Sequence, residues 1–247
     1  MEGQLWITEL LNRAFAKPVN AVLQALPPAF HPADPAAPIS NYVAMEILVI
    51  GILLLLFLVI RGRLSVDKPG GLQHLTEFMN DFITNQSREI IGEHSERFTP
   101  FLSALFLFVL FSNLIGLIPS LEAPTGAIQI TLGCALVSFF YYNIQGIKEQ
   151  GPVGYLKHFA GPVWWLAWLL FPIEIISHLA RVMSLSIRLY ANMFAGDAVT
   201  GAFFSLVPVI IPVIFLVLHL FVAFLQAYIF TLLTTIYLQG AVAHEQH

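Results

Sequence analysis

Charged residues are scarce in this chain. They make up 11% of its 247 residues, whereas a soluble globular domain carries about 25% because water must wet its surface. Apolar residues reach 57%, Phe alone occurs 21 times, and the mean hydropathy is +0.79. This composition excludes an ordinary cytosolic enzyme and a disordered scaffold. It predicts an all-α membrane protein whose solvent is mostly lipid.

Cysteine and basic residues are also rare. The single cysteine, Cys134, excludes a disulfide framework and a cysteine-rich metal site. The 11 Lys and Arg residues against 15 Asp and Glu give a net charge of -4, which is too small and too dispersed to attract nucleic acid. No HExxH zinc motif is present, and we interpret the C-terminal HEQH as a solvated tail. We therefore expect no metal and no cofactor.

Five long apolar stretches predict membrane-embedded helices, because a spanning helix needs about 20 apolar residues. We place them at about 42–60, 101–118, 127–147, 163–195 and 202–238. As helices the last two would be roughly 50 and 55 Å long, against a hydrocarbon core about 30 Å thick. Neither contains a polar turn that would let it double back. We therefore expect both to be strongly tilted.

The rest of the chain divides into three segments. Residues 1–41 form an arm with a proline-rich second half, residues 72–91 have the amphipathic pattern of a helix at the membrane interface, and residues 241–247 form a tail. The loops after the first and third stretches hold seven Lys and Arg, whereas the arm holds only Arg13 and Lys17. The positive-inside rule then predicts an extracytoplasmic arm and a cytoplasmic tail. Since no transit peptide is recognisable, a bacterial plasma membrane is favoured over an organelle.

The fourth stretch carries a polar stripe about 120° wide at the helical spacing of 100° per residue. Its members are Glu174, Ser177, His178, Arg181, Ser184, Arg188 and Asn192. A charge at the centre of a membrane helix costs about 2.5–3.5 kcal/mol, so several charges on one stripe need a reason. One interpretation is a set of contacts between helices, including a Glu174–Arg181 pair.

Arg188 does not fit that interpretation, because an arginine stays charged and needs an anion or water. Glu174 lies about 21 Å away along a helix, and Asp197 falls off the stripe. We therefore predict a partner on another subunit. In the last stretch, His219 and Gln226 share one face, and Asp197 lies across the turn between the two long stretches. This placement favours a proton relay, although a lone membrane histidine can also be a simple hydrogen-bonding group between helices.

Three runs of residues resemble subunit a of the F-type rotary ATP synthases, in the membrane Fo sector. They are SLSIRLYANMFAGD at 184–197, HLFVAFLQAYIF at 219–230 and SNLIGLIP at 112–119, and the resemblance covers approximately residues 40–240. It implies a proton-channel stator subunit beside a c-subunit ring, with b-type peripheral stalk subunits and the rest of the F1Fo complex as partners. Such a subunit is not catalytic alone; it couples proton flow through the lipid bilayer to ring rotation and ATP synthesis.

The resemblance also implies roles for individual residues. Arg188 would be the essential arginine that faces the ring carboxylate. The outer half-channel would be lined by Asn113, Asn192, Asp197, His219 and Gln226. The cytoplasmic half-channel would be lined by Glu174, Ser177, His178, Arg181 and Ser184.

Several positions depart from the commonest pattern of that family. Asp197 replaces a more usual glutamate, Ala191 replaces a glycine, and Gly116 stands where some members have an acid. Arg181 is often a lysine followed by proline, whereas Val182 follows it here. H⁺ or Na⁺ remains open as the coupling ion, because the ring subunit largely decides it. An ion-coupled secondary transporter, an intramembrane enzyme and a structural anchor are the alternatives, although no internal repeat supports a transporter.

Overall fold

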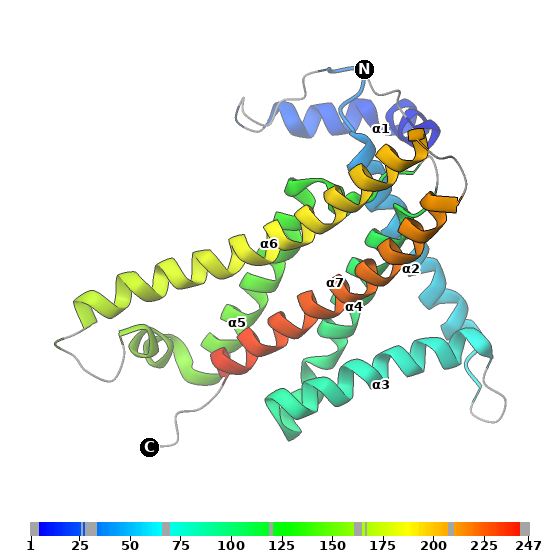
Figure 1. Cartoon of the computed structure of the whole chain (residues 1–247). Helices are drawn as coiled ribbons and strands as arrows, with labels where there is room; N and C mark the ends of the chain where they lie inside the picture. The colour runs from blue at the N-terminus through cyan, green and yellow to red at the C-terminus, as the bar shows by residue number, and fades with distance from the viewer. Residues whose placement is uncertain are drawn as a thin grey trace.

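A computed structural model describes residues 5–25, 27, 34–65, 70–118, 121–160, 165, 167–206 and 210–242. In these ranges every regular element is helical (Figure 1), which confirms the predicted all-α class. The helices are α1 (Trp6–Gln24), α2 (Asn41–Gly62), α3 (Gly71–Ile91), α4 (Thr99–Ile115), α5 (Ile128–Ala160), α6 (Ala167–Leu206) and α7 (Ile210–Val242). Two short 3₁₀ turns, η2 (Glu93–Arg97) and η3 (Pro124–Gly126), precede α4 and α5.

Four of the described helices are long and apolar enough to cross a membrane. These segments are Asn41–Gly62, Ile128–Pro152, Trp168–Phe203 and Val213–Val242. The apolar helix α4 has only 17 residues, or about 25 Å, and is shorter than a hydrocarbon core of about 30 Å. The chain is therefore a multi-pass membrane protein, as its composition predicts, and α4 is its shortest apolar helix.

The two long helices differ from the predicted stretches at their ends. Helix α6 has 40 residues and continues beyond Ala195 to Leu206, and α7 has 33 residues from Ile210 to Val242. Helix α6 can continue past Ala195 because no proline occurs between Pro172 and Leu206, and an isolated glycine such as Gly196 weakens a helix without ending it. Figure 1 shows α6 and α7 side by side, with α6 crossing α5 at a shallow slope. The two helices therefore form a long antiparallel pair.

Helix α5 reverses direction near its end, which the sequence analysis did not predict. Gly151 interrupts the helix with φ of 72°, a left-handed conformation that favours glycine. The chain then folds back, so that the Tyr155 hydroxyl donates to Asn143 Oδ1 at 2.7 Å. The Gln150 side chain donates to the Ala241 carbonyl at 3.0 Å. The helix just before the turn at Gly151 is thereby held against the end of α7.

Helix α4 lies at the centre of the buried core. Leu102, Phe106 and Val109 are almost fully buried, in one cluster with side chains from α2, α5, α6 and α7. The Phe106 ring meets the Phe224 ring of α7 edge-on, with centroids 5.9 Å apart. Helix α4 packs mainly against α7 and also contacts α2 and α3, so it supports the long pair from the α7 side.

Helices α1 and α3 lie at opposite ends of the bundle (Figure 1). Asn12 of α1 exchanges two hydrogen bonds with the Ile39 backbone, at 3.0 and 3.1 Å, so part of the arm is an anchored helix. On α3, the Phe82 ring lies 5.5 Å from that of Tyr228 on α7, whereas Phe78 is exposed. The predicted 72–91 helix corresponds to α3, and its position at a membrane surface stays a prediction. Residues 243–247 of the predicted tail lie outside the described residues.

Candidate functional site

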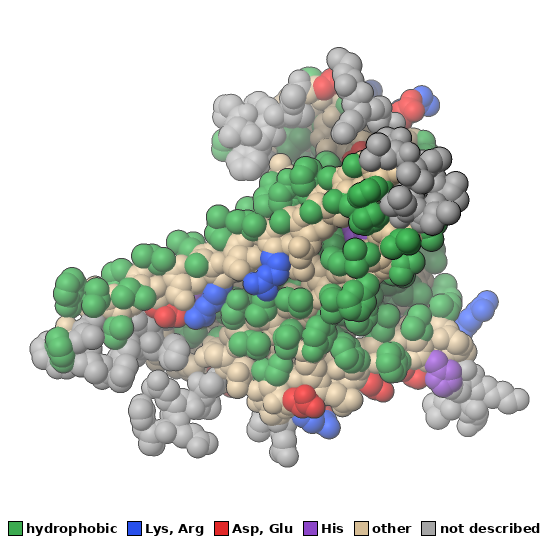
Figure 2. Space-filling view, in the orientation of Figure 1, with side chains coloured by type: hydrophobic (Ala, Val, Ile, Leu, Met, Phe, Trp, Pro, Cys, Tyr) green, Lys and Arg blue, Asp and Glu red, His purple; other side chains and the backbone are tan. Residues whose placement is uncertain are grey.

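Arg188 lies within the membrane-spanning part of α6 and has no acidic partner among the described residues. Its Nη2 atom donates to Ser184 Oγ, one turn earlier, at 3.3 Å. Figure 2 shows that the basic side chains over α6 stand out in a surface that is otherwise mostly hydrophobic. Ser184, Ala191 and Ala195 are exposed on the same side of the helix. The guanidinium is therefore surrounded by small side chains on a face that the described chain leaves open.

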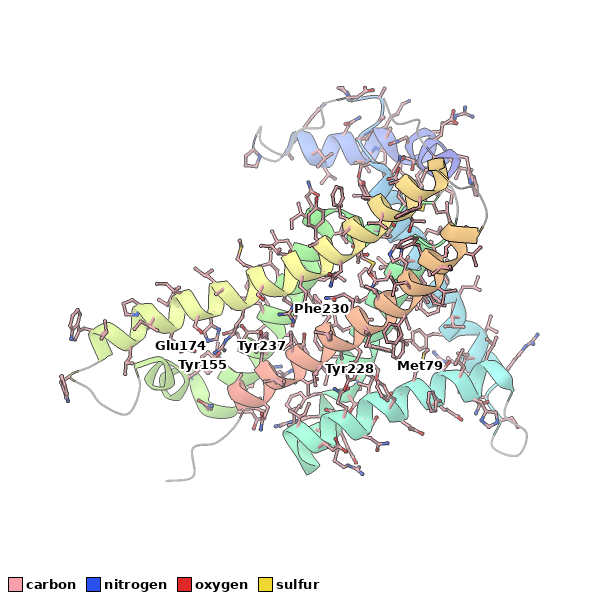
Figure 3. The ribbon with its side chains drawn as sticks, viewed as in Figure 1. Met79, Tyr155, Glu174, Tyr228, Phe230 and Tyr237 are labelled. Carbon is pink, nitrogen blue, oxygen red and sulfur yellow. The ribbon has the colours of Figure 1, made fainter. Side chains whose placement is uncertain are left out.

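One group of polar side chains gathers near the N-terminal end of α6. Glu174 Oε1 lies 3.3 Å from His178 Nε2 and 3.6 Å from Arg181 Nη2. The Arg181 guanidinium lies 5.4 Å from the centre of the Tyr237 ring on α7. Figure 3 shows Glu174, Tyr155 and Tyr237 converging there from α6, α5 and α7. The cluster therefore draws on three helices.

The two serines predicted for the cytoplasmic half-channel, Ser177 and Ser184, differ in their contacts. Ser184 accepts the hydrogen bond from Arg188, whereas Ser177 is half-buried and hydrogen-bonds to none of the described groups. Tyr155, the α5 member of this cluster, lies between two of the predicted membrane stretches and was not predicted as a site residue. Burial raises the pKa of its hydroxyl to about 12 despite the opposing charge of Arg181, so it stays protonated at physiological pH.

A second group lies near the opposite end of the long pair. Asp197 Oδ1 is 3.9 Å from Nδ1 of His219, whose side chain is only 5% exposed. The approach depends on Gly196, since a Cβ atom there would lie 2.8 Å from His219 Nε2. Asn192 donates to Gln226 Oε1 at 2.7 Å. The structure thus brings together four of the five residues predicted for the outer half-channel.

Asn113, the fifth of those residues, makes its side-chain hydrogen bonds to groups other than these four. It is fully buried and donates to the Ala223 carbonyl at 3.0 Å, while its own oxygen accepts from Thr125 at 2.7 Å. Both ends of the amide are therefore satisfied within the chain. In this structure Asn113 ties α4 to α7 and to η3.

Two cavities adjoin His219. One, of about 430 Å³, is lined by Asp197 and by Glu122 from the segment before α5. The other, of about 310 Å³, includes Asn192. His219 and Thr200 line both cavities, so the imidazole borders the cavity with two acids as well as the cavity beside Asn192.

Sequence reasoning missed Glu122. Its carboxylate accepts from Asn41 Nδ2 at 3.1 Å and shares the larger cavity with Asp197. The available signal was an acid in the loop between the second and third apolar stretches, on the same predicted side as Asp197. Gly116, where some family members have an acid, also lines this cavity, but a Cβ there would meet Ala123 Cβ at 2.6 Å. The cavity therefore has a second acid, although not at position 116.

The long pair α6 and α7 carries ionisable groups near both ends, and Arg188 lies along α6 between these groups without an acidic partner among the described residues. This arrangement is that of an ion-transporting subunit of an all-α membrane protein. The family model "ATP synthase A chain" matches residues 43–239. The chain belongs to this family, the a subunits of the ATP synthase.

Among the described residues, no group of three or more His, Cys, Asp or Glu could hold a metal ion.

The sequences of individual relatives align with most or nearly all of the chain. It is 56% identical over 245 residues to ATP synthase subunit a of Koribacter versatilis (strain Ellin345), which covers 99% of each chain. It is 50% identical over 213 residues to that of Solibacter usitatus (strain Ellin6076), covering 86% of this chain and 91% of the relative. For Sulfurihydrogenibium sp. (strain YO3AOP1) the identity is 39% over 208 residues, with 84% and 100% covered.

Proposed function

We propose that the chain is the proton-channel stator of an F-type ATP synthase and that Arg188 faces the carboxylates of a c-subunit ring. The observation that supports this most is the arrangement around Arg188. A permanent charge on a membrane helix has no acidic partner in the described chain, and exposed small side chains lie beside it. Small residues allow close approach of a neighbouring membrane helix. A carboxylate on such a neighbour would supply the missing anion.

The proposed chemistry is proton transfer without a covalent step. A ring carboxylate that faces lipid is neutral, because burial disfavours its charged form. Opposite Arg188, the fixed positive charge favours the ionised form and the proton leaves. The same charge is an electrostatic barrier between the two half-channels, which prevents protons from crossing without turning the ring.

The outer half-channel would begin at the cavity shared by Glu122 and Asp197. Protons would pass the His219 imidazole, which lines both cavities, and reach the smaller cavity beside Asn192. The hydrogen bond from Asn192 to Gln226 holds the two polar groups at the inner end of this route. Asn113 would act by holding α4 against α7.

The cytoplasmic half-channel would run along α6 past Ser184 and Ser177 to Glu174, with His178 and Arg181 beside it. Each proton that crosses releases about 2.3 kcal/mol for every 100 mV of membrane potential. Ring rotation would carry this energy to a separate catalytic head, since this subunit is not catalytic alone. No cofactor takes part in the proposed scheme.

The proposed setting is a bacterial plasma membrane, with the N-terminus outside and the C-terminus in the cytoplasm. The proposed partners are the c-subunit ring, the b-type peripheral stalk subunits and the remainder of the F1Fo complex. The exposed side of α6 around Arg188 would be the surface that meets the ring. Since the coupling ion depends on the ring as well, H⁺ is proposed on the strength of Asp197 and His219.

The test is Arg188→Ala in membranes that contain the assembled complex. ATP synthesis driven by an imposed proton gradient should fall to background, because the ring carboxylate would lose its fixed counter-charge. Arg13→Ala is the control, since Arg13 pairs on the surface with Glu9 at 2.5 Å and should leave synthesis unchanged. Normal synthesis by Arg188→Ala, in complex of normal abundance, would refute the proposal.

A further inference from the structure

Tyr142 and His178 form a chain of contacts that leads from the buried core to Glu174. Tyr142, on α5, is almost fully buried, and its hydroxyl lies 3.1 Å from His178 Nδ1. The other ring nitrogen, Nε2, lies 3.3 Å from Glu174 Oε1. Two helices thus hold one imidazole by both of its nitrogens, beside the carboxylate proposed for the cytoplasmic half-channel.

The order of these contacts determines which nitrogen of neutral His178 carries the proton. A phenol ordinarily keeps its proton up to about pH 10, so Tyr142 is available as a donor. When it donates to Nδ1, that nitrogen is the acceptor and Nε2 carries the hydrogen. The Nε2–H group then lies on the Glu174 side of the ring, with Nε2 3.3 Å from Glu174 Oε1.

We propose that His178 is a positioning residue for Glu174 and that Tyr142 fixes the orientation and tautomer of its ring. The proposal rests on the proposed function, because it assigns to the pair the control of proton release at Glu174. A ring held in place by α5 would keep its Nε2 side beside the carboxylate while a proton is released to the cytoplasm. Tyr142 has no assigned role in the sequence-based pathway, and here it sets the pH range of the cytoplasmic side.

Other groups act on the same carboxylate, and they differ from His178 in kind. Arg181 lies 3.6 Å from the same oxygen and contributes a permanent charge at every physiological pH. Tyr155 of α5 interacts electrostatically with both Glu174 and Arg181, and the Tyr237 ring of α7 lies against Arg181. Among the described residues, His178 is the imidazole that contacts Glu174.

The experiment measures ATP synthesis by the whole complex in inverted vesicles, whose outer solution is the cytoplasmic side. The external pH is varied while the driving force is held constant. Tyr142→Phe, which removes only the hydroxyl, should move the half-maximal rate to higher external pH by about one unit, because a ring that is no longer held beside Glu174 assists proton release less. The dependence on the internal pH should not change. His178→Ala should give the same shift, and the double variant should shift no further, because the two residues act in series.

Ser138→Ala is the matched control on the same helix. It removes a buried hydroxyl that lies 2.9 Å from Thr234 of α7 and does not contact Glu174. The control should keep the wild-type pH profile, since the hydrogen bond that it removes involves neither His178 nor Glu174. His178→Gln places an N–H donor near the position of Nε2. Its pH profile should therefore return most of the way to that of the wild type, and this comparison holds even if His178→Ala assembles poorly.

The possible failures are distinguishable. A Tyr142→Phe profile that superimposes on those of the wild type and Ser138→Ala would overturn the role of the pair, while the proposed function would stand as long as Arg188→Ala abolishes synthesis. An equal shift in Ser138→Ala would likewise overturn it, because general loosening would then explain the effect. Synthesis that survives Arg188→Ala would refute the proposed function itself.

Discussion

At the scale of single residues, the contact between Asp197 and His219 depends on a missing side chain. In Gly196→Ala, the new Cβ would lie 2.8 Å from the buried His219 ring. The ring must move, and overpacking of this kind costs about 1–3 kcal/mol, so we predict slower gradient-driven ATP synthesis and a lower Tm of the purified complex. Gly201→Ala is the control, because its Cβ would meet nothing within 4 Å. Equal effects of the two substitutions would contradict this account.

Asn113 supports a second prediction at this scale. Asn113→Ala leaves the buried Ala223 carbonyl and Thr125 hydroxyl without their present partner, at a cost of about 1–3 kcal/mol. Thermal unfolding of the complex should therefore occur at a lower temperature. The neighbouring Ser112→Ala is the control, since the Ser112 hydroxyl is buried with no hydrogen-bond partner among the described residues. It should be neutral or stabilising, and a loss as large as that of Asn113→Ala would refute the explanation.

At the scale of elements, the reversal of α5 depends on Gly151. An alanine there would have to adopt a φ of 72°, which costs about 1–2 kcal/mol for a residue with a Cβ atom. We predict that Gly151→Ala loosens residues 151–160 and the end of α7, seen as faster hydrogen exchange in both segments. Gly154→Ala is the control, because its Cβ would make only an ordinary 3.6 Å contact with Gln150. Unchanged exchange in Gly151→Ala would disprove the dependence.

The elements themselves were predictable to different degrees. The length of the apolar stretches predicts the membrane helices and the unusually long pair α6 and α7. In lipid, every backbone N–H and C=O group must be hydrogen-bonded within the chain, so each long apolar stretch is expected to be helical. The prediction ends the fourth stretch at Ala195, since Gly196 and Asp197 interrupt the apolar run, yet the backbone stays helical to Leu206. The return of the chain after Gly151 depends on the hydrogen bond from the Tyr155 hydroxyl to Asn143. Apolar periodicity contains no information on that contact.

The whole molecule has a predicted orientation that a single cysteine makes easy to test. Cys134 is the only cysteine and is buried, so Cys134→Ala provides a background free of thiols. In intact cells, an impermeant maleimide should label Lys17→Cys, because the arm is predicted to lie outside. It should label Lys148→Cys only in inverted vesicles, and both positions are exposed. The reverse pattern would show that the positive-inside count misleads here.

The site as a whole was predictable along one helix and not between helices. The spacing of Glu174, His178, Arg181 and Arg188 places them on one stripe of α6 without any knowledge of the fold. The partners Tyr142, Tyr237 and Glu122 come from other elements, and their positions depend on the relative rotation and height of packed helices. Single-sequence periodicity determines neither quantity.

Two of the hydrogen bonds that close the bundle join residues far apart in the chain: Asn113 with Ala223, and Gln150 with Ala241. Both acceptors lie in α7, the last helix of the described chain. Helices α4 and α5 therefore enter the bilayer before the helix that carries the acceptors for Asn113 and Gln150. A nascent chain truncated before α7 would lack the Ala223 carbonyl that Asn113 binds, and such an incomplete bundle would be open to quality-control proteases.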